Sequence, residues 1–571
     1  MSDVLDFFIS KFRSHLDLDN VPSQYHRPRP YRNAAVRFRE CSLGDFEERR
    51  RILEQEAGLN VFLFRADKIP GCDLLSDSGT TTMTMEQWAA MLLGDEAYGS
   101  NEGYFALKEQ VGRTFGEAWR QEPGLLTGER EPLFIFHQGR AAENALFTVL
   151  SRELKEKGFP RPKAFSSSLL PELRARIAHR MVSVKGQTPG PYEPFFVIPS
   201  NSHFDTTEGN IADKFMVPLN LPCREHLAND SRFPFRGNMD LDELENLLSS
   251  EPERVPLVYL TVTNNTGGGQ PVSMENIRRV GEIARAHNVP FFLDACRFAE
   301  NAWFIQQKEG GFRERSIETI VREMFEHTDG FHISFKKDGL GNIGGAVCIR
   351  QGSLFTKKYP RFMEDLTDFQ IMTEGHPTYG GLAGRDLEAI AQGLKEVVEQ
   401  DYQEYRHASI RYVVERLAAR GVPVLQPAGG HAIFLDAARF LPHLDWQDYP
   451  GQALAIELYL AGGIRACEIG SVMLGRVDAK GLETPAPHEL VRLAIPRRTY
   501  TQSHMDYVIE VLDEVWHERE SIGGVRIERA PRVLRHFRAR FARLPARANV
   551  QERLAMPAAK PHGTGAHGGR P

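Results

Sequence analysis

Strand-like and helix-like segments alternate through the middle of the chain, and this order constrains the fold more than any other feature. The apolar runs VPLVYLTVT, VPFFLDA and FHISF, at residues 255–263, 289–295 and 331–335, are typical of buried strands. Between them, the amphipathic patterns at 272–288 and 317–328 predict helices. Strand, helix and strand in this order predict a parallel sheet with right-handed crossovers. We therefore expect an α/β protein.

The flanking segments divide the chain further. The run GAVCIR at 345–350 predicts another strand, and a long helical pattern at 386–421 precedes shorter strand-like runs, HAIFLDA and ELVRLAI. We expect an N-terminal arm with part of a small domain (1–84), a large domain with a mostly parallel sheet (85–388) and a smaller α+β domain (389–545). The tail at 546–571 is rich in Pro, Gly and Ala, which predicts disorder.

Composition points to an enzyme that acts on small molecules. At 571 residues and 41% hydrophobic content, the chain is long enough for a substantial core. A net charge of -6 gives no strong field that would favour nucleic acid or an anionic membrane as partner. The six cysteines form no CxxC pair, and no apolar run approaches the roughly 18 residues that span a bilayer. We expect a cytoplasmic protein.

Two adjacent lysines stand behind a buried strand in FHISFKKDGLGNIGG, residues 331–345. Lysine is costly to bury unless it is paired or takes part in chemistry. At a strand end, close to a second cation, its pKa falls and its amine becomes a usable nucleophile. Lys337 is the candidate amine and Lys336 the second charge. The alternative is that both lysines lie on a solvated loop.

Two further features fit the same chemistry. Asp294 and Arg297, in FLDACRFAEN, follow a strand at its carboxyl end, where α/β proteins bind ligands. Gln138, Gly139 and Arg140 precede a helical pattern, so backbone amides there could cradle an anion. Pyridoxal phosphate needs an amine, a carboxylate for its ring nitrogen and a phosphate cradle. Each feature also has an ordinary explanation, a helix cap or salt bridge for the first and a simple helix start for the second.

Long motifs of the chain resemble the aromatic amino-acid β-eliminating lyases, the family of tryptophanase and tyrosine phenol-lyase. They are SFKKDGLGNIGG, FLDACRFAENAWFI, TVTNNTGGGQPVSM, LLSDSGTTTMT, LGDEAYGS, HPTYGGLAGRD and VRLAIPRRTYTQSHMD. The resemblance runs from about residue 30 to 543. It implies the pyridoxal-phosphate fold of type I, like aspartate aminotransferase, and a homotetramer with active sites between subunits.

The resemblance assigns cofactor roles to residues at matching positions. Lys337 would carry pyridoxal phosphate, with Asp294 at its ring nitrogen and Arg297 at its phenolic oxygen. The phosphate would lie against Gln138, Gly139, Arg140, Ser334 and Lys336. Phe204, in SNSHFDTT, would stack on the ring, although the sequence alone also fits an ordinary core aromatic.

Roles toward the substrate and a metal ion follow from the same matching. Arg492 would bind the substrate carboxylate with Asn265 and Ser78, and Ser76 stands where the family usually has threonine. Tyr98 would act as an acid near the leaving group, although it also fits a packed surface aromatic. A potassium ion would be bound by the carboxylate of Glu96 and the carbonyls of Gly79 and Asn342.

The chain departs from the family pattern in several places. It has extra residues before position 30, insertions around EAWRQEPGLLTGEREP and SSSLLPELRARIAHRMVSVKGQTPGPYEP, and the tail. Phe335 replaces a small residue, and we expect its bulk to lie beside the phosphate and shift the cofactor.

Three positions bear on the leaving group. Ile469, Asp205 and His536 agree with tryptophanase where tyrosine phenol-lyase has arginine, threonine and phenylalanine, whereas Cys467 is smaller than the usual family residue. The implied reaction converts L-tryptophan to indole, pyruvate and ammonia, with Lys337 as the general base. The alternatives are tyrosine phenol-lyase, a biosynthetic relative acting on another β-substituted amino acid, a transaminase-like enzyme and a non-catalytic descendant.

Overall fold

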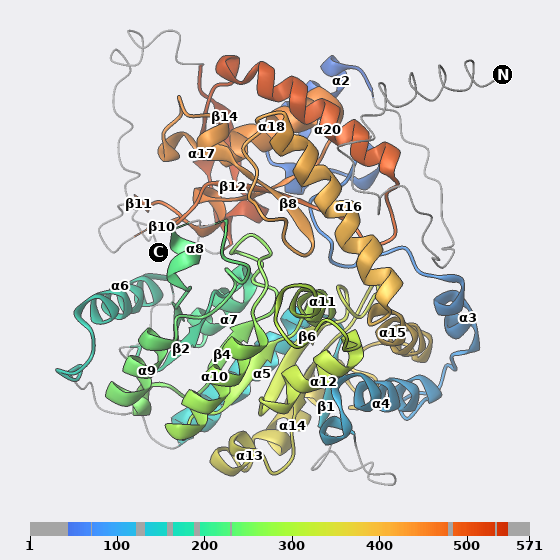
Figure 1. Ribbon diagram of the computed structural model, residues 1–571, viewed down its shortest axis with the longest axis vertical. Coiled ribbons are helices and arrows are strands. Elements are labelled where there is room, and N and C mark those ends of the chain that lie inside the picture. The colour runs from blue at the N-terminus through green and yellow to red at the C-terminus, as the bar shows by residue number, and fades with distance from the viewer. Residues whose placement is uncertain are drawn as a thin grey trace, which may run out of the picture.

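A central sheet organises the larger half of the molecule, which lies below the smaller half in Figure 1. The structure is a computed structural model that describes residues 44–69, 71–120, 132–156, 164–187, 194–228, 231–477, 483–531 and 534–545. The predicted tail at 546–571 and the residues before position 30 lie outside this part of the chain. Within it, no helix is long and apolar enough to cross a membrane.

The sheet has five strands in the order β1 (Leu133–Phe136), β7 (Gly345–Ile349), β6 (Gly330–Ser334), β5 (Phe291–Asp294) and β4 (Val258–Thr261). Strands β4, β5 and β6 pair in parallel, which confirms the predicted order. Strand β7 is antiparallel to both β1 and β6. Its direction relative to β6 follows from the short loop between them, which can only turn the chain back. The register places Thr261, Asp294 and His332 side by side on β4, β5 and β6.

A parallel pair, β2 (Val197–Ser200) and β3 (Val217–Asn220), extends the sheet beyond β4. The Asn201 side chain joins the two parts, since its amide donates to the Thr261 carbonyl at 2.9 Å and its oxygen accepts from the Thr261 amide at 2.9 Å. The loop after β2 is therefore fixed beside the carboxyl end of β4.

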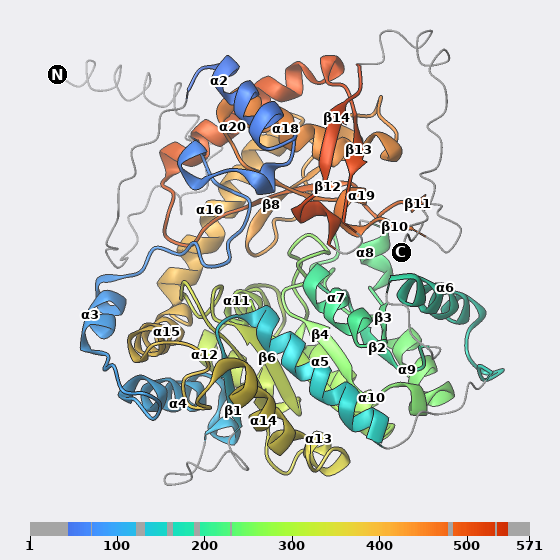
Figure 2. The same cartoon turned by 180° about the vertical axis from the view of Figure 1, so that it is seen from behind.

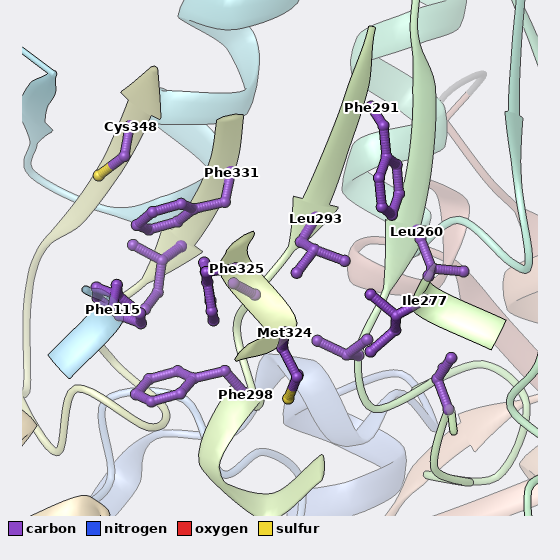
Figure 3. Close-up of a cluster of buried hydrophobic side chains, with 14 of the residues drawn as sticks. Phe115, Leu260, Ile277, Phe291, Leu293, Phe298, Met324, Phe325, Phe331 and Cys348 are labelled. Carbon is purple, nitrogen blue, oxygen red and sulfur yellow. The ribbon is translucent and has the colours of Figure 1, made fainter. Parts of the chain in front are cut away.

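Helices cover both faces of the sheet (Figures 1 and 2). One face carries α4 (Glu102–Phe115), α10 (Met274–Ala286), α11 (Phe298–Lys308) and α12 (Ile317–Glu326), and the other carries α5 (Gly139–Glu156) and α14 (Phe362–Glu374). In Figure 3, Phe115, Phe298, Phe325 and Phe331 gather under β6, with neighbouring ring centroids 4.5 to 6.1 Å apart. This aromatic packing holds β6 firmly against α11 and α12.

The smaller half is built on an antiparallel sheet, β8 (Ala432–Asp436), β12 (Leu490–Ala494) and β9 (Cys467–Ile469). The helical pattern predicted at 386–421 is two helices, α15 (Gly384–Val397) and α16 (Gln400–Ala419), because the backbone of Glu399 is extended. The described N-terminal segment, with α2 (Phe46–Arg51), lies against the C-terminal elements of this half (Figures 1 and 2). The predicted α/β class is confirmed.

Candidate active site

A cavity of about 100 Å³ opens at the carboxyl ends of β4, β5 and β6. All the residues predicted to bind the cofactor line it, namely Gln138, Gly139, Arg140, Phe204, Asn265, Asp294, Arg297, Ser334, Lys336 and Lys337. Of the residues predicted for the substrate, Ser76, Ser78 and Arg492 line it as well. Segments more than 400 residues apart in the chain thus meet at the strand edge where ligands bind in α/β proteins.

The two lysines lie in a turn directly after β6. The Lys337 amide donates to the Ser334 carbonyl at 3.3 Å, and the Gly79 amide donates to the Lys336 carbonyl at 2.8 Å. The Lys336 side chain crosses Gly79 so closely that a Cβ there would be 2.7 Å from Lys336 Cε, and Gly79 has a φ of +74°. Burial, then the charges of Lys337 and Arg140, lower the pKa of Lys336.

Asp294 ends β5 and is 3% exposed. The Cys296 amide donates to its Oδ1 at 3.3 Å. Burial alone would raise the pKa of Asp294, but hydrogen bonding and charge from His332 bring it to about 2, helped by Cys296 and Lys337. The carboxylate is therefore ionised. Because it lines the cavity, it can accept a hydrogen bond from a donor bound there.

The proposed phosphate cradle lies where α5 begins. A Cβ at Gly139 would lie 2.5 Å from Ser334 Cβ, so only glycine lets the helix start approach the end of β6 this closely. Arg140 also lies over the ring of Phe537, with Cζ 5.6 Å from its centroid. The expectation that Phe335 crowds this cradle is wrong. Because side chains alternate along the strand, Ser334 faces the cavity and Phe335 packs, fully buried, in the core on the opposite side.

Arg492 approaches the cavity from β12 of the smaller half. Its Nη1 donates to Asn265 Oδ1 at 3.2 Å and its Nη2 donates to the Leu75 carbonyl at 3.1 Å. The side chain is 5% exposed, Nε has no hydrogen-bond partner, and no described carboxylate forms an ion pair with it. A buried guanidinium with an unused donor fits a substrate carboxylate.

A buried cluster of charged side chains fixes Arg297 and the lysine turn at the wall of the cavity. Arg297 donates to both oxygens of Asp77, at 2.7 and 3.1 Å, so its guanidinium is already oriented at the cavity wall. Arg497 joins Asp77 at 2.9 Å to Glu300 and Asp338, each at 2.8 Å. Since Asp338 follows Lys337 in the chain, this cluster ties the lysine turn to the smaller half.

Of the residues predicted near the leaving group, Asp205, His536 and Cys467 lie outside the lining of the cavity but next to residues that line it. Asp205 begins α7 (Asp205–Asp213), and its Oδ2 lies 3.1 Å from His536 Nε2, with both residues buried. Cys467 pairs with Arg492 between β9 and β12. Burial raises the pKa of the Cys467 thiol to about 11, with Asp205 and Arg492 among the nearby charges.

Ile469 lines a second and larger cavity, of about 490 Å³. Residues of α6 (Pro171–Gln187) line it as well, as do Ser202 and His203, which directly precede Phe204 in the chain.

The structure does not bring together all of the residues predicted for the acid and the potassium ion. Tyr98 is 78% exposed and contacts the rings of His376 and Tyr379. The Gly79 carbonyl accepts from Asn342 Nδ2 at 3.0 Å, so these two residues are adjacent. Glu96 is 80% exposed and forms an ion pair with Arg385 at 2.7 Å. Within a single chain, Glu96 has no described contact with Gly79 or Asn342.

The cavity also contains side chains that sequence reasoning missed. They are Asp77, Glu143, Thr206, Thr261, Val262, Thr263, Cys296 and His332. The two-residue spacing of His332 and Ser334 on β6 could have identified the histidine, because both side chains lie on the same face of the strand. Nothing in the sequence indicates that Asp77 would lie beside Arg297.

The lysine turn, the buried carboxylate and the glycine at the start of α5 meet at one sheet edge, and together they fit pyridoxal phosphate. The chain belongs to the beta-eliminating lyase family, whose model matches residues 73–511. This confirms the family predicted from the motifs, and with it the type I fold.

Individual relatives match most of the length of this chain. The chain is 45% identical over 498 residues to a tryptophanase of Hyphomonas neptunium, covering 87% of this chain and 95% of that protein. It is 40% identical over 496 residues to a probable tryptophanase of Aeropyrum pernix (86% and 92%). It is 38% identical over 493 residues to a probable beta-eliminating lyase of Trichomonas vaginalis (86% and 93%).

Proposed function

We propose that the protein catalyses pyridoxal-phosphate-dependent β-elimination of L-tryptophan to indole, pyruvate and ammonia, as a carbon–carbon lyase. One observation carries the proposal: a single cavity joins the amine-bearing Lys337, the ionised Asp294 and the guanidinium of Arg492, whose Nε has no hydrogen-bond partner among the described residues. The similarity to proteins named tryptophanase supports tryptophan as the substrate.

The cavity residues fit the cofactor. Lys337 would bind its aldehyde, Asp294 would accept from its ring nitrogen, Arg297 would donate to its phenolic oxygen and Phe204 would stack on the ring. The phosphate would take hydrogen bonds from Gln138, Gly139, Arg140, Ser334 and Lys336. When bound, pyridoxal phosphate supplies an electron sink for the electron pair left on the substrate α-carbon.

The chain's own residues would orient the substrate and move its protons. Arg492 and Asn265, with Ser78 and Ser76 nearby, would hold the substrate carboxylate and so fix the α-carbon above the lysine turn. The Lys337 amine would take the α-proton as general base. Protonating the attachment carbon of the indole then makes it a leaving group, and Tyr98, or water held by Asp205 and His536, would deliver that proton.

Tyr98 and Glu96 bear on assembly. Both are exposed in the single chain, whereas their proposed roles require a cavity and an ion site. We propose that a homotetramer brings them to the site of a neighbouring subunit, where Glu96 would join Gly79 and Asn342 around potassium. Carboxylate and carbonyl oxygens are the hard ligands that such a cation prefers. The weak net charge argues against nucleic-acid or anionic-membrane partners, and the cysteines without a CxxC pair fit a reducing cytoplasm.

Ile469, Asp205 and His536 favour indole over phenol as the leaving group. A phenol hydroxyl next to the buried Ile469 side chain would lose hydrogen bonds to water, at a cost of about 1 to 3 kcal/mol. The Asp205–His536 pair offers a polar contact for the indole N–H or a water. Cys467 leaves more space beside Arg492 than a larger residue would.

We expect purified enzyme with pyridoxal phosphate and potassium to release indole from tryptophan faster than phenol from tyrosine. His536→Phe should lower indole release while largely sparing pyruvate release from S-methylcysteine, whose leaving group needs no ring protonation. Steady-state rates on the three substrates check this. Faster phenol release by the wild-type enzyme would disprove the choice of tryptophan, and an equal loss on S-methylcysteine would show that His536 acts elsewhere.

A further inference from the structure

His332 lies directly behind Asp294, in a position that the proposed mechanism does not use. It stands opposite Asp294 in the β5–β6 register and is 1% exposed. Its Nδ1 lies 3.6 Å from Asp294 Oδ1, and its Nε2 lies 3.0 Å from the Gly139 carbonyl oxygen. One imidazole therefore touches both the carboxylate proposed for the ring nitrogen and the start of the phosphate cradle.

These two contacts determine which form of the ring the site favours. A carbonyl oxygen can only accept, so Nε2 must carry a hydrogen and donate to Gly139. In a neutral ring, Nδ1 would then turn a lone pair toward the Asp294 carboxylate, and the two acceptors would repel each other. In the charged ring, Nδ1 turns an N–H toward Asp294 instead. The geometry thus favours the imidazolium.

The surrounding charges agree with that form. Asp294 flanks one side of the ring, and Glu143 Oε1 lies 3.8 Å from Nε2 on the other. Burial alone would lower the pKa of His332, but Glu143 and Asp294 raise it, against the opposing charge of Lys337. Two other titratable groups near Asp294 and Glu143, the Cys296 thiol and the Tyr259 hydroxyl, are neutral, because burial raises the pKa of each.

We propose that His332 is a positioning residue, whose imidazolium keeps Asp294 ionised and directed at the ring nitrogen of the bound cofactor. The proposal rests on the cofactor assignment of the proposed function. A carboxylate paired with a cation from behind remains an acceptor, and so stabilises a protonated ring nitrogen more strongly than an unsupported one. The negative charge of Glu143 offsets part of the free-energy cost of burying the imidazolium.

The test compares two cofactors on the intact enzyme. Pyridoxal phosphate and its 1-deaza analogue, which has a C–H group in place of the ring nitrogen, are titrated against wild type, His332→Leu and His332→Asn. We expect wild type to prefer the natural cofactor, and His332→Leu to reduce that preference about tenfold, because the positive charge next to the Asp294 carboxylate is lost. His332→Asn should retain part of it. Affinity for the analogue should change little.

The pH dependence gives a second readout. Because the pKa of His332 is raised, its charge is present at low pH and lost as pH rises through that value. Wild-type preference for the natural cofactor should therefore decline with pH, and His332→Leu should show a flatter profile. His407→Leu is the matched control, since His407 is also buried but stacks on Trp303, away from the cavity.

An unchanged preference in His332→Leu, even with a lower melting temperature, would mean that His332 only packs, and would overturn the proposal. Failure of wild type to bind pyridoxal phosphate would overturn the proposed function and this inference together. Normal cofactor results without tryptophan turnover would overturn only the choice of substrate. These failures are therefore distinguishable.

Discussion

Lys337→Ala is expected to abolish turnover and to remove the visible absorption of the bound cofactor. Lys337 and Lys336 both line the cavity. Backbone hydrogen bonds hold their turn in place, from the Lys337 amide to the Ser334 carbonyl and from the Gly79 amide to the Lys336 carbonyl. Without its amine, neither covalent attachment of the cofactor nor removal of the α-proton has a group to carry it. Absorption spectra and pyruvate release from tryptophan measure both effects.

Lys336→Ala is the matched control, because it removes a neighbouring amine of the same type. We expect it to retain covalent attachment but to bind the cofactor less tightly, since Lys336 is placed at the phosphate. Borohydride reduction followed by peptide mapping should label Lys337 in wild type. A label on Lys336 would contradict the assignment of the two residues.

Replacing Asp294 by alanine should leave cofactor binding measurable but lower elimination by about a thousandfold or more. An unprotonated ring nitrogen is a poor electron sink, and a thousandfold loss corresponds to roughly 4 kcal/mol of barrier. Asp294→Asn should give a similar loss, because an amide cannot replace the negative charge. Single-turnover rates with tryptophan measure the chemical step, and near-normal rates in either variant would refute this role.

Much of the cavity could be predicted because its residues follow strands. Apolar runs in the sequence identify the strands, and the carboxyl ends of parallel strands meet at one edge of the sheet. Asp294 and the two lysines follow such strands, so they were expected to lie near each other. The family motifs supplied the partners from other elements, including Arg492 on β12 and Phe204 just before α7. Every residue predicted to bind the cofactor lines the cavity.

The remaining features depend on packing that sequence patterns do not encode. Arg497 binds Asp77, Glu300 and Asp338, which lie 420, 197 and 159 residues away in the chain, and no local pattern indicates such a cluster. The alternation of side chains along β6 turns Phe335 into the core, whereas its large size alone suggested that it would lie beside the phosphate. The exposure of Tyr98 and Glu96 in the single chain could not be predicted, because it depends on which elements pack around them and not on the motifs that contain them.

β-Elimination in this cavity would consume only tryptophan and water, and product analysis can show this. Purified protein is given pyridoxal phosphate, potassium and tryptophan, without any keto acid, and indole and pyruvate are measured together. We expect equal molar amounts of the two products, with ammonia. A requirement for a keto-acid acceptor, or consumption of tryptophan without release of pyruvate, would contradict it.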